Sequence, residues 1–256
     1  MDEKMQKAVE LFNNEDYDSA LEIFEEFLKK EPRNAGLLNN IGTAYFKKGN
    51  LEKAAEYYMS GIQADPKLKQ LYKNLSDIYV QKKDVLSAIG VLQEAVAFMP
   101  EETYLSYALA QLYIKDSHYD IAIDELDKIL EINPEDLDAR YDLAKVYYEL
   151  GVYDSATQNY EIILEKIEDN ADLYFHTGCA YQADDEVDKA ISNFLKAINI
   201  NEAYYPAYKK LALCFLARGE NEDAIEYFED YLKFEISDEE KDSINKVISR
   251  LKANCD

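Results

Sequence analysis

Asp172, His176 and Cys179 are the residues of this 256-residue chain whose types and spacing could best support chemistry. Their i, i+4, i+7 spacing would place a carboxylate, an imidazole and a thiol on one face of a helix. Asp138 and Asp142 hold the matching places 34 residues earlier. These groups could ligate a divalent metal, but structural zinc sites show four ligands at tight sequence spacings, which this group lacks. The sequence therefore favours a solvated acidic surface beside a partly buried thiol, with no metal site.

Nothing else in the chain resembles catalytic machinery. His118, the other histidine, falls in a short expected turn, and the eight glycines form no phosphate-binding loop. Any Ser-His or Cys-His nucleophile would have to use one of these two histidines. We therefore predict no catalytic residue, no metal and no cofactor, and we predict that the protein is not an enzyme.

The cysteines and the N-terminus bear on location. Cys179, Cys214 and Cys255 form no CxxC pair and no even framework, which fits a reducing compartment. The opening MDEKMQKAVELF lacks the basic start and apolar core of a signal peptide. No apolar run approaches the roughly 20 residues of a membrane span. The expected location is cytoplasmic, without membrane insertion.

The elements that would position these side chains recur every 34 residues. Proline follows that period, at Pro32, Pro66, Pro100 and Pro134. Alanine follows it without a miss, at Ala20, Ala54, Ala88, Ala122, Ala156, Ala190 and Ala224. A fixed period of this length is typical of stacked repeats, each of which packs on its neighbours.

Each unit reads as two helices. In 35–68, apolar residues at i, i+3, i+4 and i+7 predict one buried helical stripe over 37–45 and a second over 51–62. Lys48-Gly49-Asn50 separates them, and Gly49 suits a left-handed turn residue. Gly42 and Ala54 are expected to face each other, so that the helices approach closely. Pro66 ends the unit because proline cannot continue a helix.

This pattern of small, aromatic, alanine, aromatic and proline residues resembles the tetratricopeptide repeat. One unit reads Ile41-Gly42, Tyr45, Ala54, Tyr58 and Pro66. The resemblance implies an all-α fold, a right-handed superhelical α-solenoid of stacked antiparallel helix pairs. Seven repeats would occupy 1–34, 35–68, 69–102, 103–136, 137–170, 171–204 and 205–238. The family's tryptophan is absent, and Glu168 and Glu202 replace proline, which puts the turn geometry there in question.

The two ends of the array differ from its middle. Glu3, Lys4 and Lys7 stand where later repeats carry apolar residues, so we expect no repeat before the first. Ser237 and Glu240 form a capping-box pattern that would open a C-terminal capping helix in 239–256. The apolar stripe of that helix would cover the last repeat within one self-contained solenoid domain. The stripe comprises Ile244, Val247, Ile248 and Leu251.

The resemblance also implies where a partner would bind. In this family the first helix of each pair lines a concave groove, and its second, fifth, sixth, ninth and twelfth positions face the bound peptide. A carboxylate clamp for acidic chaperone tails would need basic and Asn residues in three successive repeats. Lys73 alone fits, because Tyr104, Ala108, Asp138 and Asp142 follow it. We therefore expect no chaperone clamp.

Aromatic residues instead recur at the fifth position, as Tyr107, Tyr141 and Phe175. Beside carboxylates, such rings suit Lys or Arg side chains. We predict a peptide-binding groove for a basic or amphipathic segment of a partner protein. Its expected residues are Tyr104, Tyr107, Asp138, Tyr141, Asp142, Lys145, Tyr148, Asp172, Phe175 and His176. The alternative is that a chain with 22 tyrosines places some of them in the groove without a binding role.

The net charge of −24 points to the same kind of partner. Residues 35–102 hold eight acids and eight bases, whereas residues 103–204 hold 22 acids and seven bases. Such an acidic surface repels nucleic acid and anionic membranes and steers basic partners toward the second half.

A different reading is a self-assembling scaffold. Met5, Val9 and Phe12 give the first repeat an apolar groove face that could receive a neighbouring copy. The expected state is therefore a monomer or a weak homo-oligomer. Repeats fill 238 residues and leave no room for a catalytic domain, so an interaction scaffold remains the main prediction.

Overall fold

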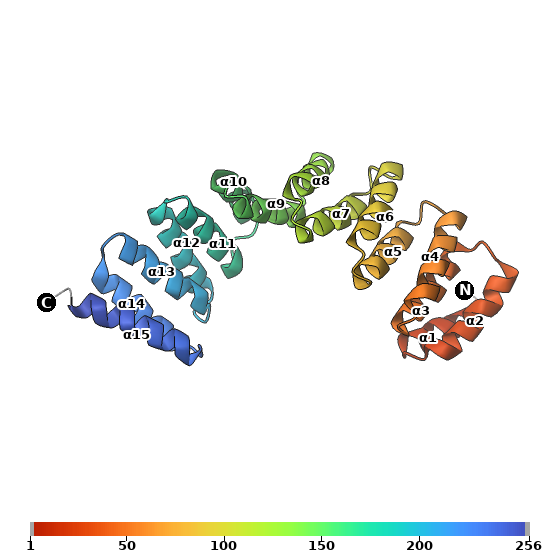
Figure 1. Cartoon of the computed structure of the whole chain (residues 1–256), viewed down its shortest axis with the longest axis horizontal. Helices are drawn as coiled ribbons and strands as arrows, with labels where there is room; N and C mark the ends of the chain where they lie inside the picture. Colours follow the sequence, from red (N-terminus) through yellow and green to blue (C-terminus); the bar gives the residue numbers. More distant parts are fainter. Residues whose placement is uncertain (1–2, 254–256) are drawn as a thin grey trace. The chain divides into compact units, whose positions relative to one another are not determined.

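The computed structural model describes residues 3–253 and shows an all-α protein of consecutive packed helix pairs (Figure 1). The fold class expected from the sequence, an α-solenoid of the tetratricopeptide kind, is confirmed. The chain divides into two compact units at Pro134–Glu135. We call residues 3–134 unit 1 and residues 135–253 unit 2 and describe each by itself.

Unit 1 contains eight helices, in which each helix packs on the next (Figure 1). The first helices of successive pairs also contact each other, as α3 does with α5 and α5 with α7. Their bounds are α1 Glu3–Asn13, α2 Tyr17–Lys30, α3 Ala35–Lys47, α4 Leu51–Ala64, α5 Lys69–Gln81, α6 Val85–Phe98, α7 Thr103–Lys115 and α8 Tyr119–Ile132.

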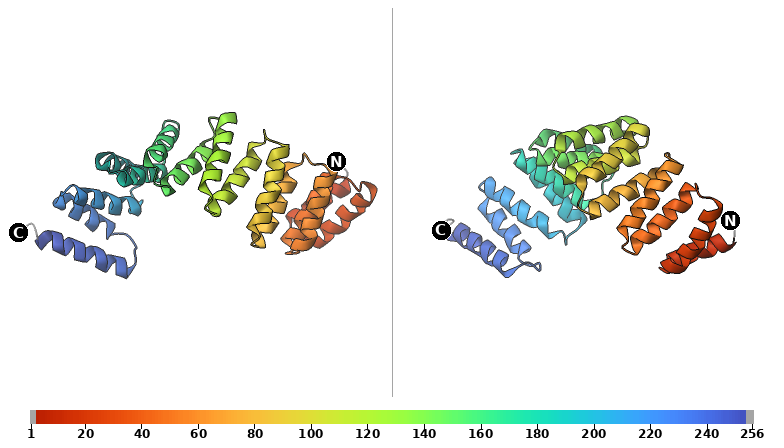
Figure 2. Two further views of the ribbon diagram at one scale, coloured as in Figure 1. Left: turned by 45° about the horizontal axis from the view of Figure 1, so that its top comes forward. Right: turned by 45° about the vertical axis from the view of Figure 1, so that its right-hand side comes forward.

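Unit 2 continues with the same helix–turn–helix pattern and ends in a longer single helix (Figure 2). Here α11 and α13 contact each other in addition to their sequence neighbours. The bounds are α9 Leu137–Glu149, α10 Tyr153–Leu164, α11 Ala171–Ala183, α12 Val187–Ile200, α13 Tyr205–Ala217, α14 Asn221–Tyr231 and α15 Asp238–Ala253. No helix within 3–253 combines the length and the apolar character needed to cross a bilayer.

Every turn inside a helix pair contains one residue with positive φ. Gly49 has φ +79°, which confirms the left-handed residue expected there. Only three of the seven are glycines, although side chains disfavour this conformation by about 1–2 kcal/mol. The positive-φ residues are spaced 34 apart, at Glu15, Gly49, Lys83, Ser117, Gly151, Asp185 and Gly219.

Small residues let aromatic rings enter the helix pairs. A Cβ added at Gly42 would lie 2.6 Å from the Tyr58 ring, and one at Gly178 would lie 2.7 Å from Phe194. The main neighbour of Gly42 is therefore Tyr58, a closer partner than the sequence expectation of Ala54. In the next repeat the expected pairing does occur, because the Ser76 hydroxyl donates to the Ala88 carbonyl at 3.3 Å.

The connection between α10 and α11 departs from the repeat. Helix α10 has 12 residues where α2, α4, α6, α8 and α12 have 14, so this connection spans 165–170 and is longer than the connections that follow those five helices. The missing proline is not a sufficient cause, because the connection containing Glu202 keeps the usual length. The altered turn geometry expected at both glutamates is found only at Glu168.

Helix α15 begins as the sequence predicts, because the Ser237 hydroxyl accepts from the Glu240 amide at 3.3 Å. The Glu240 carboxylate does not complete a capping box. It accepts instead from Lys209 Nζ at 2.5 Å. Ile244, Ile248 and Leu251 are buried, with Val247 partly buried beside them. Residues 254–256, including Cys255, lie outside the described part of the chain.

Candidate functional site

The predicted groove residues divide between the two units. Tyr104 and Tyr107 lie on α7 in unit 1, and the other eight lie on α9 and α11 in unit 2. The structure therefore supports a separate account of each group. Tyr104 is exposed, Tyr107 is partly buried, and Asp138, Lys145 and Asp172 are the most exposed of the rest.

Unit 1 carries a pocket of about 530 Å³ between α5, α6 and α7. Its apolar lining includes Val80, Leu92 and Leu112, and Tyr104 and Tyr107 stand beside them. A concave apolar site with a few polar groups is the usual form of a binding pocket. The Lys69 ammonium lies 6.0 Å from the Tyr104 ring centroid, so this ring already has one cation nearby.

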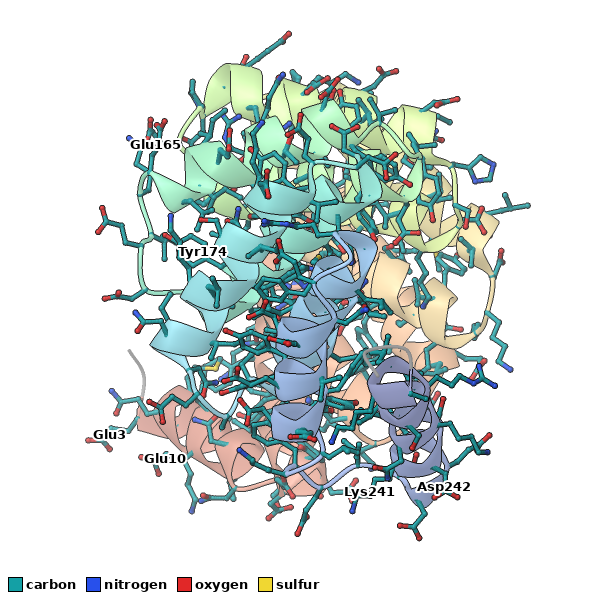
Figure 3. All side chains as sticks on the ribbon, turned by 90° about the vertical axis from the view of Figure 1, so that its left-hand side faces the viewer. Glu3, Glu10, Glu165, Tyr174, Lys241 and Asp242 are labelled. Atoms are coloured by element: carbon teal, nitrogen blue, oxygen red, sulfur yellow. The ribbon has the colours of Figure 1, made fainter. Side chains whose placement is uncertain are left out.

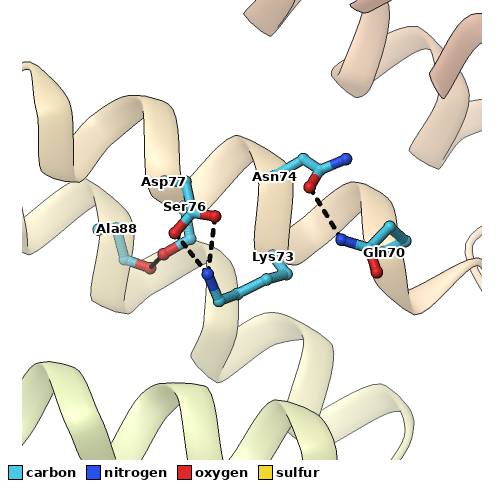
Figure 4. A network of polar contacts seen from close by, with 6 residues as sticks. All are labelled: Gln70, Lys73, Asn74, Ser76, Asp77 and Ala88. Atoms are coloured by element: carbon cyan, nitrogen blue, oxygen red, sulfur yellow. Dashed lines mark hydrogen bonds and ion pairs between the residues drawn. The ribbon is translucent and has the colours of Figure 1, made fainter. Parts of the chain in front are cut away.

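Polar side chains of α5, at this unit 1 pocket and beside it, are paired within the protein. Lys73 Nζ contacts both Asp77 carboxylate oxygens, at 2.6 and 2.7 Å (Figure 4). One turn earlier on α5, the Gln70 amide donates to Asn74 at 2.9 Å, and Asn74 in turn donates to Asn39 at 2.9 Å. Because the lysine and the aspartate neutralise each other, the remaining charged side chain of this lining is Lys115, which is positive.

Unit 2 gathers a cluster of rings around α11. Phe175 lies 5.4 Å from Tyr204 and 5.8 Å from Phe194, measured between ring centroids. His176 lies 6.0 Å from Tyr141 and 6.3 Å from Tyr160. Aromatic pairs at these separations stabilise one another beyond their buried area. We call Tyr141, Tyr160, Phe175, His176, Phe194 and Tyr204 the ring cluster.

The Asp172 carboxylate is the polar centre of the ring cluster. It accepts from the Tyr204 hydroxyl at 2.7 Å and from the Tyr141 hydroxyl at 3.4 Å. His176 Nε2 lies 3.4 Å from the same carboxylate. These donors orient Asp172 while more than half of its side-chain surface stays exposed. The arrangement presents a fixed negative charge between aromatic rings.

Burial sets the protonation states around this carboxylate. It raises the pKa of Tyr141 to about 12, with the Asp172 charge adding to the effect. Burial lowers the pKa of His176 below its ordinary value; Asp172 opposes this shift and Lys145 adds to it. The pKa of the Cys179 thiol rises to about 11, again through burial. The phenol, imidazole and thiol are therefore neutral near pH 7, and the thiol is a poor nucleophile.

The remaining predicted residues of unit 2 do not join the cluster equally. Lys145 Nζ lies 5.6 Å from the Tyr141 ring centroid and so occupies one approach to that ring. Tyr148 packs against Tyr153 at 5.6 Å. Asp138 is exposed at the first turn of α9, and Asp142 is half-buried. The two lysines of α13 are engaged elsewhere, Lys209 with Glu240 and Lys210 with Gln182.

The metal set weighed from the sequence is only partly assembled. Asp172 and His176 are neighbours, but Cys179 is buried with 8% of its surface exposed. Within residues 3–253, no group of three or more His, Cys, Asp or Glu side chains is arranged to hold a metal ion.

Two further pockets combine predicted groove residues with side chains that the sequence did not single out. One, of about 300 Å³, lies at the first turns of α9 and α11, next to the α10–α11 connection. The other, of about 290 Å³, lies in the first two repeats and includes Val9, Phe12, Asn39 and Asn40. Side chains from separate repeats form both pockets, so the order of residues along the chain does not reveal them.

Tyr204 is the most informative residue that sequence reasoning missed. It occupies the N-cap position of α13, where α3, α9 and α11 have Asn34, Asp136 and Asn170 with capping side chains. An aromatic residue at a position that favours short polar side chains was a usable signal. Its hydroxyl bonds to Asp172, in the first turn of α11, instead of capping its own helix.

Comparison with known proteins identifies the family. A profile described as tetratricopeptide repeat matches residues 5–69 and 175–239, which together make up just over half of the chain. The chain therefore belongs to the tetratricopeptide repeat family. A profile of subunit 3 of the anaphase-promoting complex, or cyclosome, matches residues 81–163. No curated protein sequence matches the chain.

Solved structures show the same fold. A tetratricopeptide repeat protein from Parabacteroides merdae is 23% identical, with a TM-score of 0.61 and 98% of each chain covered. The C-terminal part of a repeat protein from Cytophaga hutchinsonii is 18% identical, with a TM-score of 0.77, over 93% of this chain and 98% of that one. YrrB, described as a repeat protein with an unusual peptide-binding site, is 22% identical, with a TM-score of 0.60, over 72% and 95%.

Proposed function

We propose that this protein is a non-catalytic interaction scaffold that binds a peptide segment of a partner protein on the exposed faces of its first helices. The tetratricopeptide repeat is generally a protein-interaction fold, and YrrB, which shares it, is described as binding a peptide. The proposal for this chain specifies a basic or amphipathic segment. The neutral, buried state of the Cys179 thiol supports a role without nucleophilic catalysis.

The observation that carries the proposal is the oriented Asp172 carboxylate within the ring cluster. The hydroxyl of Tyr204 bonds to this carboxylate and orients it, yet most of its side chain remains open to solvent. Rings beside a fixed carboxylate attract cationic side chains at roughly 0.5–2 kcal/mol per contact. The unit 1 pocket, with its apolar lining, supports the amphipathic form of the same proposal.

Selection from a random peptide library tests the proposal. Peptides of about twelve residues would be selected on the wild type, and their affinities would then be measured by fluorescence anisotropy. A variant of the first helices, Tyr104→Ser with Asp138→Lys, is expected to lower the affinity for these peptides at least tenfold. These two side chains are exposed, so the variant should keep the wild-type stability.

A control changes one aromatic residue and one aspartate on second helices. Phe98→Ser with Asp223→Lys alters exposed residues of α6 and α14 and should change affinity less than twofold. Circular dichroism and urea unfolding would establish that both variants are folded. Failure to select any peptide, or loss of binding only in the control, would contradict the proposal.

Self-assembly is the second candidate function, favoured by the pocket in the first two repeats. Val9 is exposed although apolar, and it lines this pocket with Phe12. If copies associate there, the sedimentation coefficient should rise with protein concentration, and Val9→Lys should abolish the rise. A coefficient that is independent of concentration would exclude this function.

A further inference from the structure

The pocket at the first turns of α9 and α11 has a composition unlike that of the unit 1 pocket. Its walls are apolar, from Leu137, Ile163, Ile167 and Leu173. Its polar lining comes from Asp138, Asn170, Asp172 and Tyr141. The lining therefore combines an aliphatic surface with two carboxylates and contains no lysine or arginine.

The early end of α10 brings one of the walls to this pocket. Because the helix stops at Leu164, Ile167 lies in the connection and not in a helix. Ile167 is 38% exposed, so part of this aliphatic wall is open to solvent. The open aliphatic surface is thus a product of the connection that follows the shortened α10.

Two lysines lie near the pocket but are not part of its lining. Lys145 lies against the Tyr141 ring, 5.6 Å from its centroid. Lys166, in the α10–α11 connection, pairs with Glu135 at 3.1 Å. The Asp172 donors Tyr204 and Tyr141 are neutral phenols, so they orient the carboxylate without cancelling its charge.

These features define the occupant. A lysine or arginine side chain has an aliphatic stem, which suits the leucine and isoleucine walls, and a cationic head, which suits two carboxylates. An acidic side chain would be repelled, and a purely apolar one would desolvate the carboxylates without replacing their hydrogen bonds. The volume of about 300 Å³ is enough for one long side chain.

We propose that this pocket binds one basic side chain, lysine or arginine, of the partner peptide. The inference rests on the proposed peptide-binding function and adds the position and the chemistry of one anchor. Asp138 and Asp172 hold the cationic head, and Ile163 and Ile167 hold the stem.

A double-mutant cycle with selected peptides tests the pocket. Each basic residue of a bound peptide is replaced by norleucine, which keeps the aliphatic stem and removes the charge. One replacement is expected to weaken binding to the wild type at least tenfold. The same replacement should weaken binding less than threefold in the Asp138→Asn, Asp172→Asn variant, because this variant has already lost both charges.

The control for the cycle is Asp120→Asn with Asp223→Asn. Both residues are exposed acids in the first turns of helices, as Asp138 and Asp172 are, so net charge and helix-end effects change equally. In this control variant, the norleucine replacement should still weaken binding at least tenfold. The Asp172→Asn substitution still offers an oxygen to the Tyr204 hydroxyl.

Ile167→Lys is an independent variant that places an amine at the pocket without altering Asp172. This substitution should weaken binding of the unmodified peptide at least tenfold.

The outcomes separate the inference from the function on which it rests. If peptides bind, but the norleucine replacement weakens binding equally in the wild type and in the Asp138→Asn, Asp172→Asn variant, the pocket is overturned. The scaffold function is not affected by that result. Unchanged affinity in the Ile167→Lys variant also overturns the pocket. A library that yields no binding peptide of any composition overturns both.

Discussion

Units 1 and 2 share one helix–turn–helix framework but present pockets of different chemistry. The unit 1 pocket is larger, mostly apolar, and its Lys73–Asp77 pair is internally neutralised. The smaller pocket of unit 2 has two carboxylates and lies beside the ring cluster. The comparison teaches that a few positions of a constant repeat decide what the repeat can bind.

One such position lies four residues after the repeating alanine. It is Tyr58 in the second repeat and Phe194 in the sixth, both almost fully buried. In the third repeat it is Leu92, whose smaller side chain lines the unit 1 pocket. Phe24 holds this position in the first repeat and lines the pocket there, so a ring does not by itself close the space between the helices.

The largest predicted effect concerns the ring that supports the unit 2 cluster. Phe194→Ala should lower the free energy of unfolding by about 3–5 kcal/mol, because it empties a fully buried site against Phe175. Urea unfolding followed by circular dichroism measures the change. Leu195→Ala, at an exposed position on the same helix, should change it by less than about 0.5 kcal/mol. Equal losses in the two variants would mean that the ring cluster is not anchored in the core.

A smaller effect is expected at the left-handed turn residues, of which unit 1 has three that are not glycine and unit 2 has one. Lys83→Gly should raise the free energy of unfolding by about 0.5–1 kcal/mol, since relief of the side-chain clash exceeds the added chain entropy. Urea midpoints measure the gain. Gly151→Ala, which replaces glycine by a residue with a side chain in unit 2, should lower the free energy of unfolding by about 1 kcal/mol. A destabilised Lys83→Gly protein would show that this side chain stabilises the turn by contacts.

The smallest effect is a pH dependence specific to unit 2. The His176 imidazole faces Asp172 on its own helix, Tyr141 and Lys145 on α9, and Tyr160 on α10. Burial holds its pKa below the ordinary 6.5, so the fold favours the neutral form. This stability is present above pH 6.5 and is lost as the pH falls through the lower pKa of the folded state.

Proton NMR of the two histidines measures that titration, and His118→Gln assigns the signals. The His176 imidazole should titrate with an apparent pKa below 6.5. This pKa should rise toward 6.5 when urea unfolds the protein and removes the packing against Tyr160. An apparent pKa above 6.5 would mean that the Asp172 charge outweighs burial. Ala108 holds the equivalent position in unit 1, so a matching pH dependence is not expected there.

The repeat period and the hairpins were predictable, because the 34-residue spacing of alanine and the apolar stripes act within short stretches of chain. The place of His118 in a short turn was predicted for the same reason, and it is confirmed, because His118 directly precedes α8. The binding role of the groove residues stays a prediction.

Contacts between residues that are distant along the chain could not be predicted from the sequence. The hydrogen bond from Tyr204 to Asp172 joins residues 32 positions apart and depends on how two helix ends meet. The early end of α10 was equally hidden, since Glu168 and Glu202 share the same substitution but only one connection changes. Both features result from packing, which local propensity does not encode.

The longer α10–α11 connection was made without adding a residue, since two helical positions became loop while the 34-residue spacing stayed constant. Such a change leaves no gap in an alignment of the repeats and keeps all later positions in phase. A repeat array can in this way acquire a new recognition element by substitution alone, one repeat at a time, without disturbing its neighbours.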